Sequence, residues 1–243
     1  MLLDPTAIEL GAAALIGASI GAFAATAAIR LSEGRNPWRG RSCCDGCGRQ
    51  LSVRETIPIL GYVTSKGRCR TCRAQIDPLQ PVSEFAGLVL LPLCLWWWPG
   101  LDGVLIGALA MLLLTTAIVD LRTYRLLDVF TIPIVTVSAM LAYRHHELGA
   151  GFLASIISAL ILSGLKLSLE RKRLKPMLGW GDVKLVSAVA LGLGDRTSLM
   201  MVIAAGLGLL AVRLRPKDAG GQIPFGPMLT GATILTYFAL IAP

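Results

Sequence analysis

Charged residues are scarce in this chain. Asp, Glu, Lys and Arg make up 16% of its 243 residues, whereas hydrophobic residues make up 54% and the mean hydropathy is +0.67. A soluble domain carries about a quarter charged residues, so the composition excludes a water-soluble globular protein. The charge is also concentrated in a few stretches between apolar runs, which is typical of a protein that crosses a membrane several times.

Histidine is scarcer still, because His145 and His146 are the only two in the chain. They follow an apolar run and fall on the opposite face of the expected membrane from the acidic residues described below. A Ser-His-Asp triad or a catalytic zinc held by histidines therefore does not fit this sequence.

Eight apolar runs alternate with the polar stretches. They cover approximately residues 7–29, 85–98, 103–119, 129–143, 151–165, 183–194, 198–212 and 225–242. A membrane-spanning helix needs about 20 residues, so we expect the shorter runs to extend into their flanks, tilt or re-enter. The pattern predicts an all-α polytopic membrane protein with about eight transmembrane helices. We expect a first helix at 1–29, a small cytoplasmic loop domain at 30–84, and a membrane catalytic domain of about seven helices at 85–243.

The net charge of +8 is explained by topology. If the first polar block is cytoplasmic and the chain then alternates, all 23 Lys and Arg residues except Arg144 and Arg196 fall on the inner side. An excess of positive charge on the cytoplasmic side is the normal pattern of membrane proteins. We therefore expect contact with membrane lipid and no nucleic acid, and we expect a multi-pass membrane protein.

The cytoplasmic block contains two CxxC pairs, Cys44 with Cys47 and Cys69 with Cys72. Four thiolates in this paired spacing fit a tetrahedral structural zinc. A loop of this size has little core of its own, so a metal would keep it folded. A disulfide or redox pair is the alternative, although the reducing cytoplasm disfavours stable disulfides. Cys43 could also replace Cys44 as a ligand.

Two acidic residues stand at the ends of apolar runs. Asp120 closes one run, and Asp182 opens another in the motif Gly179-Trp180-Gly181-Asp182. An ionisable group at the edge of a membrane segment suggests a functional site. A negative charge at a helix C-terminus is disfavoured, so the position of Asp120 needs a functional reason. Helix capping is an alternative explanation for Asp182 and is the favoured one for Asp128.

Two carboxyl groups that lie close together can share one proton. One then acts as a base toward water and the other as an acid toward a carbonyl, as in aspartic proteases. We expect Asp182, at a helix N-terminus beside Lys184, to be the base and Asp120 to be the acid. Gly179, Gly181, Lys184, Asp128 and Glu84 are expected to support the site or contact the substrate.

These motifs together resemble the type IV prepilin peptidases, which are membrane aspartic peptidases of the GxGD type. The resemblance extends over nearly the whole chain. It comprises the paired CxxC loop, the stretch PLQPVSEFAG with Glu84, the segment from Asp120 to Asp128, the GxGD motif ending at Asp182, and the block from Ile223 to Pro227.

The resemblance implies that Asp120 and Asp182 are the catalytic pair. It implies a location in the bacterial cytoplasmic (inner) membrane, with the active site facing the cytoplasm. The implied substrates are prepilin or pseudopilin precursors, cut just after a glycine that ends a short basic leader. It also implies N-methylation of the new N-terminus with S-adenosylmethionine in members that carry the cysteine loop. The alternatives are a metal-dependent membrane transporter or sensor that uses the CxxC loop, and a membrane scaffold without catalysis.

Overall fold

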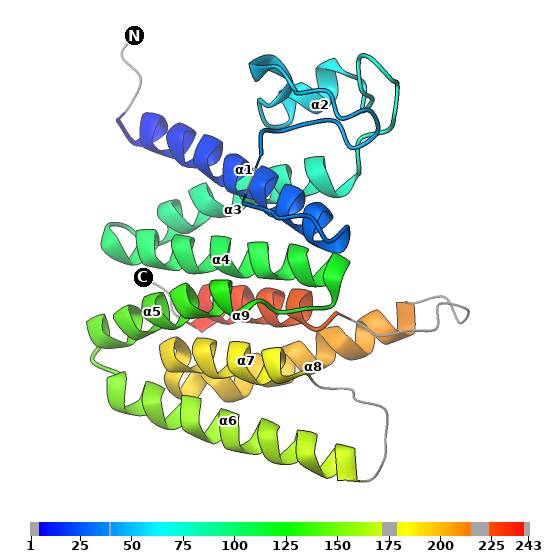
Figure 1. Ribbon diagram of the computed structural model, residues 1–243. Coiled ribbons are helices and arrows are strands. Elements are labelled where there is room, and N and C mark those ends of the chain that lie inside the picture. Colours follow the sequence, from blue (N-terminus) through cyan, green and yellow to red (C-terminus); the bar gives the residue numbers. More distant parts are fainter. Residues whose placement is uncertain (1–4, 39, 172–178, 215–223, 241–243) are drawn as a thin grey trace.

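The computed structural model describes residues 5–38, 40–171, 179–214 and 224–240. Ile223 of the motif before the last helix and the basic run at 172–175 lie outside these residues. The helices are α1 (Pro5–Ser32), α2 (Leu60–Thr64), α3 (Leu79–Trp97), α4 (Leu101–Thr123), α5 (Asp128–Arg144), α6 (Leu148–Arg171), α7 (Trp180–Leu193), α8 (Thr197–Leu214) and α9 (Gly226–Leu240). The eight long helices run back and forth through one stack (Figure 1), and α2 lies in the cysteine loop.

The described residues form helices and no sheet, apart from two isolated β-bridges in the cysteine loop. The all-α prediction is therefore confirmed. Within the part of the chain that the structure describes, five segments are long and apolar enough to cross a membrane: Thr6–Ser32, Leu79–Trp97, Leu101–Thr123, Leu148–Arg171 and Trp180–Leu214. The last segment joins α7 and α8, which the short 3-10 helix Gly194–Arg196 separates. The count of eight crossings remains a prediction, because α5 and α9 have only 17 and 15 residues.

Helix α3 begins earlier than the apolar run at 85–98 suggested. Its first turns include Gln80, Ser83 and Glu84, and the last two are buried. A polar helix start of this kind is stable only where the buried groups are hydrogen-bonded. Glu84 accepts hydrogen bonds from the backbone N–H of Ile59 at 2.6 Å and from Gln80 at 3.2 Å. The backbone of the cysteine loop, through the N–H of Ile59, therefore satisfies the buried carboxylate at the start of α3.

Helices α1 and α3 touch along their backbones. A Cβ atom added to Gly17 would clash with the carbonyl oxygen of Gly87, and one added to Gly87 would clash with that of Gly17. Gly21 approaches the carbonyl of Ser83 in the same way, whereas Gly11 has no such neighbour. Small residues that let helix backbones approach closely are a typical device of membrane helix pairs. Gly17 and Gly21 of α1 therefore allow the close packing of α1 on α3.

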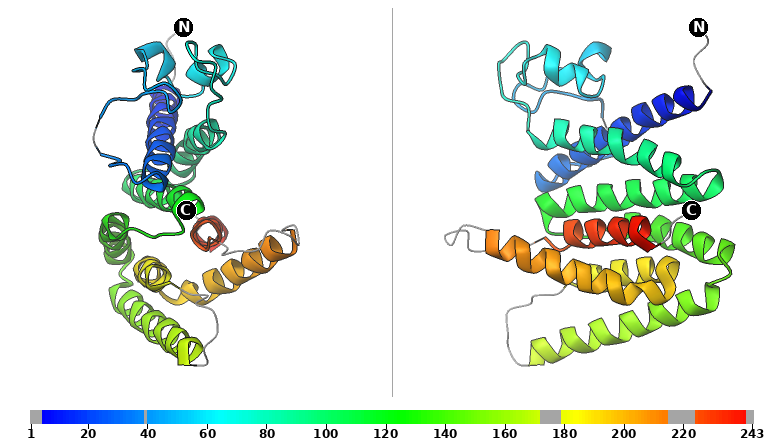
Figure 2. Two further views of the ribbon diagram at one scale, coloured as in Figure 1. Left: turned by 45° about the vertical axis from the view of Figure 1, so that its right-hand side comes forward. Right: turned by 180° about the vertical axis from the view of Figure 1, so that it is seen from behind.

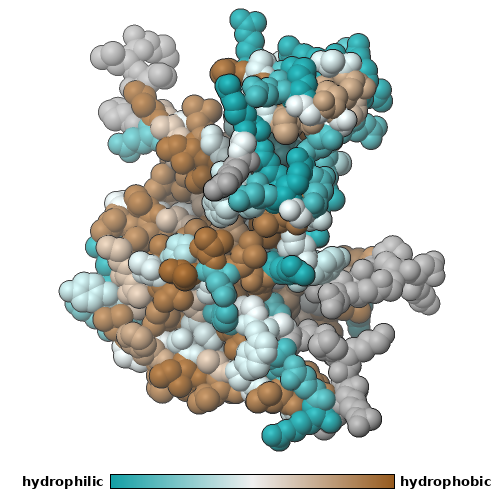
Figure 3. All heavy atoms as spheres, viewed as in Figure 1, coloured by the Kyte–Doolittle hydropathy of each residue, from teal (hydrophilic) through white to brown (hydrophobic). Residues whose placement is uncertain are grey.

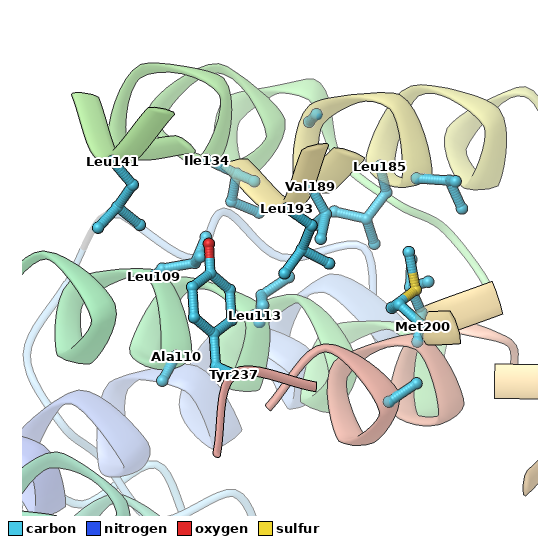
Figure 4. Close-up of a cluster of buried hydrophobic side chains, with 14 of the residues drawn as sticks. Leu109, Ala110, Leu113, Ile134, Leu141, Leu185, Val189, Leu193, Met200 and Tyr237 are labelled. Atoms are coloured by element: carbon cyan, nitrogen blue, oxygen red, sulfur yellow. The ribbon is translucent and has the colours of Figure 1, made fainter. Parts of the chain in front are cut away.

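The main core lies where α4, α5, α7, α8 and α9 meet. Figure 4 shows their side chains converging, among them Leu113 of α4, Ile134 of α5, Val189 of α7, Met200 of α8 and Tyr237 of α9. A second, smaller cluster joins α1 to the last turns of α4 and the start of α5, through Ala24, Val119 and Phe130. The main core thus packs against the middle of α4, and the smaller cluster packs against its last turns.

The outer surface of the helices is apolar. Leu160, Ile161, Val202 and Leu209 are each more than 60% exposed. In Figure 3 the hydrophobic residues cover the lower helices, and the hydrophilic residues gather on the cysteine loop. The two views in Figure 2 show α8 projecting from the stack beside α9. Exposed apolar faces of this size suit contact with lipid rather than with water.

Candidate active site and metal centre

One end of the helical stack collects the acidic motifs. Helix α4 ends there, and α5, α7 and α9 begin there, so that residues far apart in the sequence become neighbours (Figure 1). The turn after α4 is sharp, because Tyr124 adopts a left-handed conformation with φ of 53° and its N–H donates to the carbonyl of Asp120 at 2.9 Å. This geometry stops α4 one turn after Asp120.

Asp120 is 5% exposed and lies in the last turns of α4. Its Oδ2 accepts a hydrogen bond from the backbone N–H of Gly226 at 2.8 Å. Gly226 is the first residue of α9, so this N–H points outward from a helix N-terminus. A Cβ atom on Gly226 would lie 2.9 Å from the same oxygen. Glycine is therefore required there for the close approach of the carboxyl group.

Asp182 lies in the first turn of α7. Its Oδ2 accepts a hydrogen bond from the backbone N–H of Gly179 at 2.8 Å, so it caps its own helix. Gly181 packs tightly against another connection, because a Cβ atom there would be 2.7 Å from the Cβ of Leu126. The GxGD turn is thus pressed against the segment between α4 and α5. Capping occupies one carboxylate oxygen and does not prevent a chemical role.

The carboxyl groups of Asp120 and Asp182 lie close enough for their charges to interact. Each is held by a backbone N–H of a different helix start, Gly226 for Asp120 and Gly179 for Asp182. Two acids that are positioned by rigid backbone groups and partly shielded from water can divide acid and base functions between them. Asp120 and Asp182 are therefore the candidate pair for acid–base chemistry at this end of the stack.

Lys184 and Asp128 form a pair of their own. The Lys184 ammonium lies 2.8 Å and 3.0 Å from the two oxygens of Asp128, and both side chains are exposed. Asp128 is the first residue of α5, so the pair links the starts of α5 and α7. The sequence placed Lys184 beside Asp182, but the structure pairs it with Asp128, since successive side chains on a helix point in different directions.

Lys166 is a site residue that the sequence did not reveal. It lies near the end of α6, is 7% exposed, and its ammonium is 5.2 Å from the centroid of the Trp180 ring and 3.1 Å from Glu170. Its positive charge also interacts with Asp182. In the sequence Lys166 was one of many inner-side charges, and the Trp between the two glycines was the only hint of a cation partner.

Glu84 lies in another part of the molecule. Its carboxylate is 7% exposed and bonds to the cysteine loop and to Gln80 of its own helix. Ile59, which donates to it, has a φ of 64°. A β-branched residue with positive φ is strained, so the buried carboxylate holds the loop in a conformation that it would not adopt alone.

The four predicted metal ligands come together in the cysteine loop. The sulfur atoms of Cys44, Cys47, Cys69 and Cys72 all lie within 4.8 Å of one another, and those of Cys44 and Cys72 are 3.7 Å apart. Sulfur atoms around a tetrahedral zinc at about 2.3 Å are separated by roughly 3.8 Å. The six cysteines are free thiols. The donor set and its spacing fit a structural zinc.

The two CxxC turns have the same local shape. The backbone N–H of Cys44 donates to the carbonyl of Arg49 at 2.9 Å, and the backbone N–H of Cys69 donates to the carbonyl of Ala74 at 2.8 Å. Cys43 lies outside the sulfur cluster and forms an isolated bridge with Gln50. Hydrogen bonds from the backbone of Cys72 and Thr71 lower the pKa of the Cys69 thiol to about 6. That thiol is therefore largely ionised at neutral pH, as a metal ligand must be.

Comparison with known proteins agrees with these observations. Residues 15–98 match the bacterial peptidase A24 N-terminal domain, and residues 107–214 match the type IV leader peptidase family. A prepilin leader peptidase/N-methyltransferase of Aeromonas salmonicida is 30% identical over 202 residues, covering 78% of this chain and 68% of that protein. One of Burkholderia pseudomallei is 30% identical over 207 residues, covering 82% and 67%. No solved structure matches this chain.

Proposed function

The chain belongs to the type IV leader peptidase family, and on that premise we propose that Asp120 and Asp182 are its catalytic pair. It is a multi-pass membrane peptidase that cleaves the leaders of prepilins. The transporter, sensor and scaffold alternatives receive no support from the relatives, which are peptidases by name. The observation that carries the proposal is the meeting of two partly enclosed carboxyl groups at one end of the helical stack.

In the proposed mechanism Asp182 is the general base and Asp120 the general acid. Asp182 takes a proton from a water molecule that attacks the scissile carbonyl carbon, and Asp120 gives its proton to the carbonyl oxygen. Asp182 then gives the proton that it took to the leaving nitrogen, the carbon–nitrogen bond of the tetrahedral intermediate breaks, and Asp120 recovers a proton from a hydroxyl group of the intermediate as the carboxyl product forms. The amine leaves as the new N-terminus. The two acids titrate as a unit and can exchange roles between steps. Both positions are supported by the backbone hydrogen bonds from Gly179 and Gly226.

The surrounding residues position this pair. Gly179 and Gly181 allow the tight turn that carries Asp182, and the Lys184–Asp128 ion pair fixes α7 against α5. Lys166 supplies a nearby positive charge, and its ammonium lies over the ring of Trp180. We assign these residues positioning roles. Glu84 supports the cysteine loop instead, through its hydrogen bond to Ile59.

The substrates are prepilins, and we extend them to pseudopilin precursors with a short basic leader followed by a hydrophobic helix. We propose that cleavage takes place at the cytoplasmic face of the inner membrane, because the acids lie at the helix ends that carry the excess of positive charge. The same charge suits anionic lipid, and nucleic acid has no part in this function. We retain the division into a helix at 1–29, a zinc loop at 30–84 and a catalytic domain at 85–243.

The cysteine cluster is proposed to bind structural zinc through Cys44, Cys47, Cys69 and Cys72. Bound zinc would hold the two CxxC turns together, which the small polar loop cannot do with its own core. The relatives are also named N-methyltransferases. We therefore propose that this chain uses S-adenosylmethionine to methylate the amine that cleavage exposes.

The test of the catalytic pair uses purified full-length protein in detergent and a prepilin-type precursor. Asp120→Asn and Asp182→Asn should each lower the cleavage rate roughly 10³-fold or more, with unchanged helix content by circular dichroism. Asp195→Asn is the matched control, because Asp195 is exposed in the turn between α7 and α8. Wild-type cleavage by either of the first two variants would end the proposal.

A further inference from the structure

The cysteine loop leaves a small apolar surface uncovered. Helix α2 packs with one side against the 3-10 helix Val53–Glu55, because a Cβ atom on Gly61 would lie 2.2 Å from the carbonyl oxygen of the last residue of that helix. Leu60 and Val63 stand three positions apart and share another side of α2, where they are 57% and 61% exposed. Val53 is 80% exposed on the neighbouring 3-10 helix. We call Leu60, Val63 and Val53 the apolar patch.

The segment that carries the apolar patch is positively charged. Residues 51–76 include five basic residues and one acidic residue, Glu55, whose carboxylate lies 2.7 Å from the guanidinium of Arg49. Arg54 and Lys66 flank the patch in the sequence, and both are exposed. Surfaces that combine exposed apolar and basic side chains are typical of proteins that bind anionic lipid at a membrane interface.

The loop lies beside the spanning helices rather than beyond their ends. Trp38 packs on Phe23, with ring centroids 5.4 Å apart, and Phe23 lies nine residues before the end of α1, which is about 13 Å along the helix axis. Ile59, the residue before α2, donates to Glu84 at 2.6 Å, and Glu84 lies five residues after the start of α3. Both α1 and α3 are long and apolar enough to cross a membrane. The start of α2 is therefore held close to the membrane surface.

The loop also lies at one edge of the helical stack. In Figures 1 and 2 it sits next to α1 and α3, on the side of the molecule away from α6 and α8. Helix α1 packs against α3 and α4, so the stack continues from α1 in the direction away from the loop. A loop in this position overhangs the lipid that surrounds the protein.

We propose that the apolar patch docks the cysteine loop on the adjacent membrane surface. Its three apolar side chains lie among the lipid headgroups, and Arg54 and Lys66 meet the phosphates of anionic phospholipid. A lipid surface is favoured over a protein partner because both ends of the loop are tethered to spanning helices and its positive charge matches that of anionic lipid. This contact goes beyond the peptidase activity and does not depend on it. It holds the metal-binding loop at a fixed height at the membrane.

The test replaces Val63 by the photoreactive amino acid benzoylphenylalanine in full-length, zinc-loaded protein. The protein is placed in vesicles of equal parts phosphatidylcholine and phosphatidylglycerol and irradiated. Mass spectrometry should find phospholipid attached at position 63, with phosphatidylglycerol enriched about fivefold, because a basic residue near an anionic surface contributes about this factor. The same replacement at Leu160 is the positive control, since Leu160 is 68% exposed on the apolar face of α6. There the two lipids should react equally.

The charge requirement is tested by combining Arg54→Gln with Lys66→Asn, which should abolish the enrichment. Asparagine tolerates the left-handed φ of 53° at position 66, and zinc content reports whether the loop is folded. Arg213→Gln is the matched control and should keep the enrichment, because Arg213 is a basic residue exposed at the end of α8.

Three outcomes would overturn the proposal. They are attachment of position 63 to a second copy of the chain, no attachment there while position 160 reacts, and an enrichment that is absent from wild type or unchanged by the double substitution. Asp120→Asn should label as wild type does, so that failure of the catalytic proposal and failure of this one are distinguished.

Discussion

The cysteine loop and the helical stack are stabilised by different kinds of interaction. The loop has few buried apolar side chains, and its structure depends on four clustered thiols, the Arg49–Glu55 ion pair and the hydrogen bond from Ile59 to Glu84. The stack is held by a large apolar core and close helix contacts. Among the described helices the buried Asp, Glu, Lys and Arg side chains fall into two groups: Asp120 and Lys166 lie at the candidate site, whereas Arg30 and Glu84 bond to the cysteine loop.

The largest difference between the two regions should appear on metal removal. A chelator, or Cys72→Ser, should unfold the loop, since structural zinc contributes on the order of 10 kcal/mol, and should leave the stack helical. Limited proteolysis would then cut between residues 41 and 76, and circular dichroism would retain most of the helix signal. Cys43→Ser is the matched control and should keep full zinc content, because Cys43 lies outside the sulfur cluster. A loop that resists protease without metal would refute this.

Gly226→Ala tests how tightly the stack positions an acid. The new Cβ atom would lie 2.9 Å from Oδ2 of Asp120, so the carboxyl group must move. A displacement of this kind should lower the cleavage rate roughly 10- to 100-fold, with little change in KM. Gly231→Ala on the same helix is the control, because its Cβ atom would meet only Leu207 at 3.4 Å. Equal rates for the two variants would contradict the assigned role of Gly226.

Lys166→Met removes a buried positive charge beside the catalytic pair and keeps the length of the side chain. We expect a roughly tenfold slower reaction at neutral pH and a shift of the acidic limb of the pH–rate profile to higher pH, because less of the base is ionised. Lys166→Arg should restore most of the rate, since a guanidinium can also stack on Trp180. A profile that is unchanged in Lys166→Met would show that the charge has a purely structural role.

The smallest effect concerns an ion pair of the loop. The Arg49 guanidinium, with help from Ser52, lowers the pKa of Glu55 from 4.5 to about 2. Because the folded value is the lower one, the pair stabilises the loop fully above about pH 4.5 and loses this contribution as the pH falls toward 2. When the pH of wild-type protein is lowered, the cysteine thiols should be protonated and release zinc before Glu55 is protonated, because the pKa of Glu55 is about 2. Glu55→Gln should release zinc at a slightly higher pH in a titration with a zinc indicator; an unchanged midpoint would contradict it.

The sequence predicted those residues whose type is unusual for their position, or whose spacing is typical of one kind of site. Asp120 could be singled out because an acid at a helix C-terminus has no simple structural reason, and the CxxC spacing predicted the sulfur cluster that the structure contains. The resemblance to prepilin peptidases then joined these observations into one function. Each of these signals is local in sequence.

Contacts between distant segments could not be predicted in the same way. The hydrogen bond from Gly226 to Asp120 joins α9 to α4, and no periodicity or spacing marks it. Lys166 was indistinguishable from the other basic residues of the inner side until α6 packed beside Trp180. Lys184 was placed beside Asp182 by sequence proximity, whereas helix geometry turns it toward Asp128.

The backbone contact between Gly17 and Gly87 also sets the spacing of the two helices that flank the cysteine loop. The chain leaves α1 after Ser32 and enters α3 at Leu79, and the two helices cannot change their spacing without a clash or a gap. The packing of α1 against α3 therefore fixes the positions of the two ends of the loop. A homologous loop of another length could be exchanged there without disturbing the acids, provided that its ends meet the same two anchor points.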